Sequence, residues 1–120
     1  MKNKLRNTKW IAGGLEAFLA IPIVGATVIL GTYWLPLFIM MAFHIYNLVM
    51  SSEDGYAKTG SIVGIIGNAL GWFPGIGWVF HVITAILLMV EASQMKIEPE
   101  VITPKVETLE EKTNESDKID

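Results

Sequence analysis

Between Trp10 and Val90 the chain is apolar with very few interruptions, and this feature limits its fold more than any other. Only four charged residues occur in these 81 positions: Glu16, Glu53, Asp54 and Lys58. The whole chain has 120 residues and is 52% hydrophobic. A soluble domain of this size leaves much of its surface in water and would not cover so many apolar side chains. We therefore expect an integral membrane protein, with the lipid bilayer as its immediate partner.

The charged residues concentrate at the two ends of the chain. Residues 1–9 carry four basic side chains and no acid, whereas residues 97–120 carry eight acids and three lysines. We expect a basic cytoplasmic segment over 1–10, a transmembrane helical domain over 11–93 and a disordered acidic tail over 94–120. The short basic cluster beside an apolar run predicts a topology signal or a contact with anionic lipid, and not nucleic-acid binding.

Four apolar segments are separated by turn-forming residues. They run over Ile11–Gly31, Tyr33–Met50, Ser61–Phe73 and Ile76–Val90, and the charged loop Ser51–Gly60 divides them into two pairs. Pro22 is expected to kink the first segment, and a turn at Pro74, Gly75 and Gly77 separates the last two. The predicted fold is an all-α polytopic bundle with four transmembrane segments arranged as two hairpins. With an even number of crossings, the basic amino terminus places both ends in the cytoplasm of a multi-pass cell-membrane protein.

The third segment is short and rich in glycine. Gly60, Gly64, Gly67 and Gly71 recur at steps of three or four residues and leave a groove on a helix face. Such grooves let another backbone approach closely in lipid. We expect these glycines to serve helix packing, either within one four-helix monomer or, as the alternative, in an oligomeric pore or a contact with a partner.

Five polar residues fall inside the apolar segments: Glu16, His44, Asn47, Asn68 and His81. Polar groups at this depth are costly in lipid and usually face protein or water. They predict interhelical hydrogen bonds that fix helix register, with proton or ion movement and a metal site as alternatives. No H-x-x-x-H or E-x-x-H spacing supports a metal, and the sequence predicts no cofactor.

Two of these residues are expected to be neighbours because they lie at a similar depth in the membrane. Glu16 lies five residues inside the first segment and His44 lies six residues before the end of the second, so both lie at a similar depth. We expect them to meet, with Asn47 completing the site. His81 is expected nearer the opposite membrane face and outside the site.

Catalytic and nucleotide-binding patterns are absent from the sequence. The chain contains no cysteine, no nucleophile elbow and no phosphate-binding G-K-[ST] loop. We therefore expect a non-enzyme that binds another membrane protein, as an accessory, regulatory or immunity-type factor. A holin-like or channel-forming homo-oligomer and a small proton-coupled transporter using Glu16, His44 and His81 are the alternatives.

Overall fold

The computed structural model describes residues 2–96, and this part of the chain contains five α-helices and no strand. The helices are α1 (Lys2–Leu19), α2 (Pro22–Gly31), α3 (Leu35–Glu53), α4 (Thr59–Leu70) and α5 (Pro74–Gln94). The predicted all-helical class is confirmed at this level. Most of the acidic tail, from residue 97 onward, lies outside the described residues, so its expected disorder stays a prediction.

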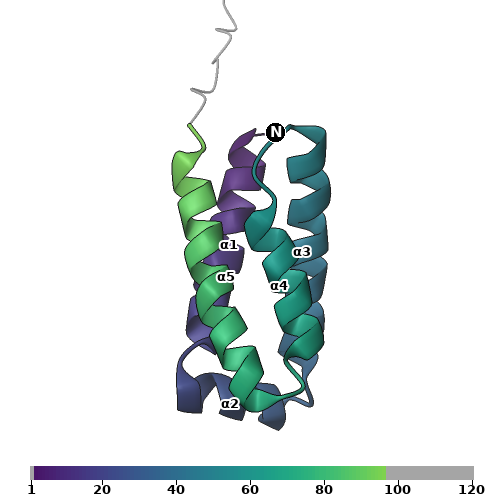
Figure 1. Ribbon diagram of the computed structural model, residues 1–120, viewed down its shortest axis with the longest axis vertical. Coiled ribbons are helices and arrows are strands. Elements are labelled where there is room, and N and C mark those ends of the chain that lie inside the picture. The colour runs from purple at the N-terminus through teal and green to yellow at the C-terminus, as the bar shows by residue number, and fades with distance from the viewer. Residues whose placement is uncertain (1, 97–120) are drawn as a thin grey trace, which may run out of the picture.

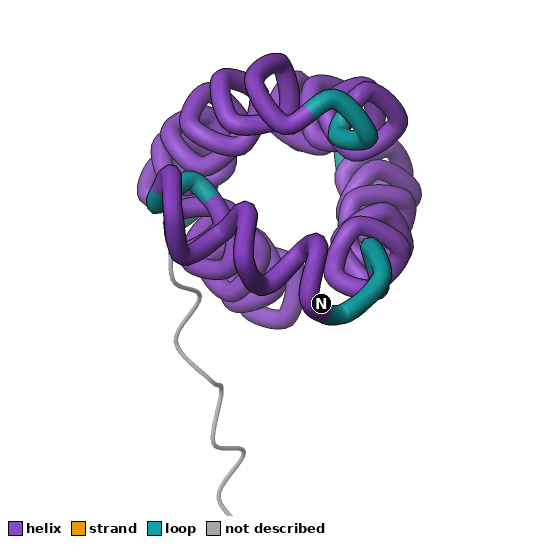
Figure 2. The backbone as a smooth tube through the Cα atoms, turned by 90° about the horizontal axis from the view of Figure 1, so that it is seen from below, coloured by secondary structure: helices purple, strands orange, loops and turns teal. Residues whose placement is uncertain are grey.

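Four of the helices run along one axis, and the short α2 lies across one end of them (Figure 1). The amino terminus of α1, the loop between α3 and α4 and the end of α5 lie at the opposite end, which we call the loop end. Seen along the axis, α1, α3, α4 and α5 surround a common interior (Figure 2). The closest packing is between α1 and α5 and between α4 and α5.

The first apolar segment is divided into two helices instead of forming one kinked span. α1 ends at Leu19, α2 begins at Pro22, and their axes differ by 98°. Proline has no N–H to continue the helix, and its ring clashes with the preceding turn. Gly25 completes the bend, because a Cβ at that position would lie only 1.9 Å from the carbonyl oxygen of Leu19.

The basic amino-terminal residues form part of the bundle. Residues 2–10 are the first half of α1, and Lys9 is fully buried. The predicted first segment began at Ile11, the start of the apolar run, and this is nine residues after the start of α1 at Lys2. This difference matters below, because it changes the depth of Glu16.

The two predicted turns are present but shorter than expected. The loop between α3 and α4 covers only residues 54–58, since Ser51 continues α3 and Gly60 lies in α4. The turn after α4 covers residues 71–73, and α5 begins at Pro74, with Gly75 and Gly77 in its first turn. Proline is favourable at a first helical position, where its missing N–H has no intrahelical partner to lose.

Two helices, α3 and α5, are long and apolar enough to cross a membrane. The bent pair α1–α2 adds a third span if it is counted as one. α4 has 12 residues, or about 18 Å at 1.5 Å per residue, which is well short of the hydrocarbon thickness of a bilayer. The four spans expected from the sequence are therefore not confirmed.

The glycines of α4 all pack against other helices of the same chain. A Cβ on Gly60 would lie 3.0 Å from the Leu88 side chain, and one on Gly67 would lie 2.7 Å from Cβ of Phe80. A Cβ on Gly71 would lie 3.1 Å from Leu37. The expected packing role is thus present within one monomer.

Candidate functional site: a buried carboxylate between two histidines

The interior of the bundle contains an acidic side chain with an imidazole on each of its oxygens. Glu16 of α1 is fully buried, and its Oε1 lies 2.6 Å from Nε2 of His44 on α3. Its Oε2 is hydrogen-bonded to Nδ1 of His81 on α5. Three helices that are far apart in the sequence therefore meet at one carboxylate.

A fourth helix contributes an amide to the same carboxylate. Asn68 of α4 directs its Nδ2 to the Gly64 carbonyl oxygen at 2.8 Å, and the same nitrogen lies 3.4 Å from Glu16 Oε1. The second contact is long for a hydrogen bond and counts as a weak one. The carboxylate of Glu16 on α1 is thus contacted from the other three long-axis helices, and His44 and His81 are its titratable neighbours.

Gly64 gives His44 the space that its ring occupies. A Cβ at Gly64 would lie 2.4 Å from His44 Cε1 and 2.5 Å from both ring nitrogens. Contacts this short do not occur between real atoms, so any other residue at position 64 would displace the ring. The glycine row of α4 and the histidine of α3 are therefore parts of the same site.

The sequence-based pairing of Glu16 with His44 is present, but two details of that prediction are wrong. His81 is a full member of the site, and Asn68, not Asn47, supplies the amide. The error over His81 came from the depth count: α1 begins at Lys2, so Glu16 lies only three residues before the end of its helix. His81 lies seven residues after the start of α5, which brings it to the same level.

Each histidine uses one ring nitrogen on Glu16, and its other ring nitrogen has no hydrogen-bond partner among residues 2–96. These outer atoms are His44 Nδ1 and His81 Nε2, and both are buried. An imidazole that bonds through one nitrogen can accept or release a proton at the other, because both nitrogens can carry hydrogen. The Glu16 carboxylate therefore connects two groups that each have a free outer face.

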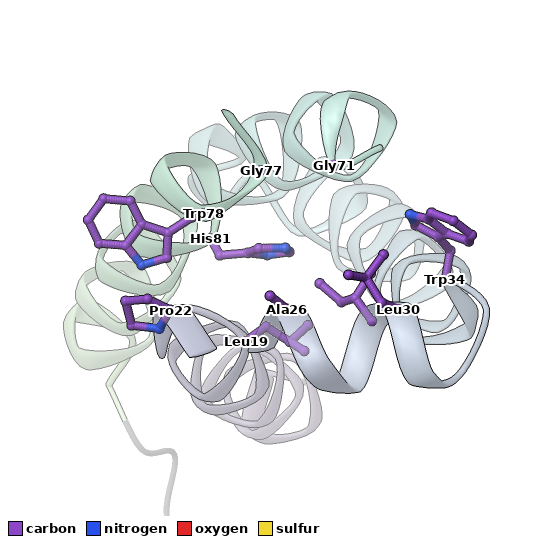
Figure 3. Close-up of a pocket in the computed structure, with 10 residues that line it drawn as sticks. Leu19, Pro22, Ala26, Leu30, Trp34, Gly71, Gly77, Trp78 and His81 are labelled. Carbon is purple, nitrogen blue, oxygen red and sulfur yellow. The ribbon is translucent and has the colours of Figure 1, made fainter. Parts of the chain in front are cut away.

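His81 also borders a small cavity near α2. This cavity has a volume of about 30 Å³, and its walls include Leu19, Ala26, Trp34 and Trp78. Figure 3 shows the His81 ring pointing from α5 into the interior beside these residues. Because a water molecule needs about 10–15 Å³ of such space, at least one water fits there.

Sequence reasoning missed several buried polar residues closer to the loop end. Ser51, Ser61 and Thr84 are buried, and Lys9 forms a buried ion pair with Glu91, with Nζ and Oε2 2.5 Å apart. The available signal was spacing: Lys9 and Glu16 are seven residues apart, which places them on the same face of α1. The described residues contain no cluster of three or more ligands that could hold a metal ion.

Comparison with known proteins gives no further guide to the role of this site. No family model matches the chain, and no curated protein or solved structure matches it either.

Proposed function

We propose that the protein is a small, non-enzymatic membrane protein that transfers protons through the Glu16 carboxylate and its two histidines. The observation that carries this proposal is the free outer nitrogen on each imidazole, His44 Nδ1 and His81 Nε2. A site built only to hold helices together needs the inner hydrogen bonds, and it gains nothing from two further buried nitrogens without partners. Unsatisfied buried polar groups cost about 1–3 kcal/mol each.

The transfer is a sequence of proton hops with no other bond changes. A proton binds to His44 Nδ1, and His44 gives its Nε2 proton to Glu16 Oε1. The neutral carboxyl group then rotates, which brings the protonated Oε1 to His81. In the tautomer that carries its hydrogen on Nε2, His81 accepts this proton on Nδ1 and releases its Nε2 proton to water in the cavity by α2. One proton enters, one leaves, and the carboxylate regains its negative charge. The starting tautomers return when each ring releases the proton on Nδ1 to water and takes one up on Nε2, with no net gain or loss of protons.

The surroundings of the relay favour passage across a bilayer. α3 and α5, which carry the two histidines, are the helices whose length and composition suit a membrane span. The outward faces of all five helices carry exposed large apolar side chains, among them Leu15, Ile23, Ile45, Ile66 and Ile86. We propose a multi-pass protein of the cell membrane with its basic loop end in the cytoplasm, in which α4 completes the bundle without spanning the full bilayer.

Proton flux into vesicles tests this function directly. The purified protein is placed in liposomes containing a pH-sensitive dye, and a potassium diffusion potential drives proton entry. Glu16→Gln keeps a hydrogen-bonding group of the same shape but accepts no proton, so flux should fall by roughly 100-fold. Glu53→Gln is the matched control, because Glu53 is exposed at the end of α3. Wild-type flux in a folded Glu16→Gln protein would refute the proposal.

The accessory, regulatory or immunity-type role expected from the sequence stays a prediction, as does the holin-like oligomer. The glycine grooves of α4 were one part of the support for both, and the acidic tail, which lies mostly outside the described residues, was another for the accessory role. Gly60, Gly64 and Gly67 instead contact Leu88, His44 and Phe80 of the same chain, so those grooves are filled. For this reason the proton-transfer reading has the better support of the three.

A further inference from the structure

A second polar centre lies at the loop end of the bundle, beyond the glutamate–histidine site. Lys9 Nζ donates hydrogen bonds to Glu91 Oε2 at 2.5 Å and to the Ala57 carbonyl oxygen at 2.6 Å. The other oxygen of Glu91 accepts a hydrogen bond from the Gly60 backbone N–H at 2.7 Å. This centre joins α1, α5 and the start of α4.

A cavity of about 230 Å³ adjoins this centre and gives it access from outside the bundle. Its walls are formed by Lys9, Glu91 and residues of the α3–α4 loop and of the end of α5, including Tyr56 and Gln94. Among the residues that line this cavity, the titratable side chains besides Glu91 are Lys9 from α1, which pairs with Glu91, and Tyr56 from the loop. The cavity is much larger than the one beside His81, so water has ample room at this end.

Between the two centres, α3 and α4 carry a row of buried polar atoms for which the described part of the chain offers no hydrogen-bond partner. They are Ser61 Oγ next to Gly60, Ser51 Oγ, both polar atoms of the Asn47 side chain and finally His44 Nδ1. On α3 the row follows steps of four and three residues, from Ser51 to Asn47 to His44, which keeps it on one helix face. It covers about 10 Å at 1.5 Å per residue.

The facing helices carry fewer polar groups over the same distance. On α1 the buried residues between Lys9 and Glu16 are Ala12 and Gly13, and on α5 the buried residues between His81 and Glu91 are Thr84, Ala85 and Leu88, of which Thr84 alone is polar. Ala12 and Leu88 are fully buried in the hydrophobic core. More of the buried polar groups between the two centres therefore lie on α3 and α4 than on α1 and α5.

We propose that protons travel between the Lys9–Glu91 cavity and His44 along water molecules held by Ser61, Ser51 and Asn47. Buried polar groups in natural proteins are commonly satisfied by ordered water, and a chain of such waters conducts protons by successive hops. Glu91 is the group that exchanges protons with bulk water at the loop end. This inference rests on the proposed function and assigns the path that supplies the relay.

The decisive variant is Asn47→Leu, which replaces the amide by an apolar group of similar size. Removing an unpartnered buried amide should leave the melting temperature unchanged or raise it. Flux should nevertheless fall at least about tenfold, an added barrier of about 1.4 kcal/mol. Thr84→Val is the matched control, since it also removes a buried hydroxyl without a partner, but on the apolar side. Its flux should stay within about twofold of wild type, which is less than about 0.5 kcal/mol.

The outcomes separate this path from the relay itself. If Glu16→Gln abolishes flux while Asn47→Leu retains it, the path is wrong and the proposed function stands. Equal losses in Asn47→Leu and Thr84→Val would also refute a route along α3 and α4. If Glu16→Gln retains flux, the proposed function fails, and this inference fails with it.

A chemical readout tests the path without measuring flux. The chain has no cysteine, so Ser61→Cys introduces a single thiol into the row, and Ala12→Cys introduces one into the apolar side. In liposomes a small water-soluble thiol reagent should modify Ser61→Cys at least about ten times faster, because thiolate formation requires contact with water. Equal rates for the two thiols would overturn the proposed water row.

Discussion

Replacing Gly64 by alanine should disrupt the site through a single added methyl group. The new Cβ would lie 2.4 Å from His44 Cε1, whereas ordinary contact begins at 3.4 Å, so the ring must move by 1.0 Å. The His44–Glu16 hydrogen bond is now 2.6 Å long, and a shift of that size along the bond takes it to 3.6 Å. At that separation the hydrogen bond no longer exists.

The expected loss of stability follows from two destabilising contributions and one that opposes them. A hydrogen bond to a charged group contributes about 1.5–3 kcal/mol, and overpacking a well-filled interior costs about 1–3 kcal/mol. Alanine has a better helix propensity than glycine, and this offsets about 1 kcal/mol of the loss in stability. The net destabilisation should therefore be about 1.5–5 kcal/mol.

Thermal unfolding in detergent, followed by tryptophan fluorescence, measures this loss against a matched variant. Gly14→Ala makes the same change on the exposed face of α1, where an added Cβ has no heavy atom within 4 Å. That variant should be as stable as the wild type or slightly more stable. If Gly64→Ala unfolds at the same temperature as Gly14→Ala, the close contact between His44 and the α4 backbone does not exist.

Three further predictions use the same assay or a simple variation of it. Lys9→Met leaves the Glu91 carboxylate buried without its cation and should cost about 3–5 kcal/mol, whereas adding Glu91→Leu to that variant should restore most of the loss. Gly67→Leu should lower the unfolding temperature because Phe80 occupies its groove, and Leu70→Ala, on a more exposed side chain, should lower it less. Gly55→Ala, at a φ of +72°, should cost about 1 kcal/mol of stability, and an unchanged unfolding temperature would contradict the left-handed turn there.

Hydrophobic patterning predicts the helical class and the positions of most helix boundaries. Turn-forming residues identify the breaks near residues 54–58 and 71–73 because glycine, proline and charge act locally. The position at which α1 begins is not predictable in this way. Lys2–Lys9 is polar in sequence, and its helix is held by a tertiary contact, the ion pair of Lys9 with Glu91.

The candidate site is partly predictable for a related reason. Glu16 and His44 belong to consecutive segments, so a count of residues from the segment ends brings them together. His81 joins them only because the 98° bend after Leu19 ends α1 soon after Glu16. A proline in an apolar run predicts a break, but the angle of that break depends on contacts such as the one between Gly25 and Leu19.

The glycine row and the polar residues look like separate features in the sequence, but they depend on each other. Gly64 lets the His44 ring lie against the backbone of α4, and Asn68, one turn further along, donates to the Gly64 carbonyl oxygen. A helix of 12 residues could not supply this surface with larger side chains, because they would separate α3 from α4 and move His44 away from Glu16. The small residues of α4 therefore serve the chemistry of the interior. Large apolar side chains remain exposed on the outside of the bundle, which suits the two helices that are long enough to cross a membrane.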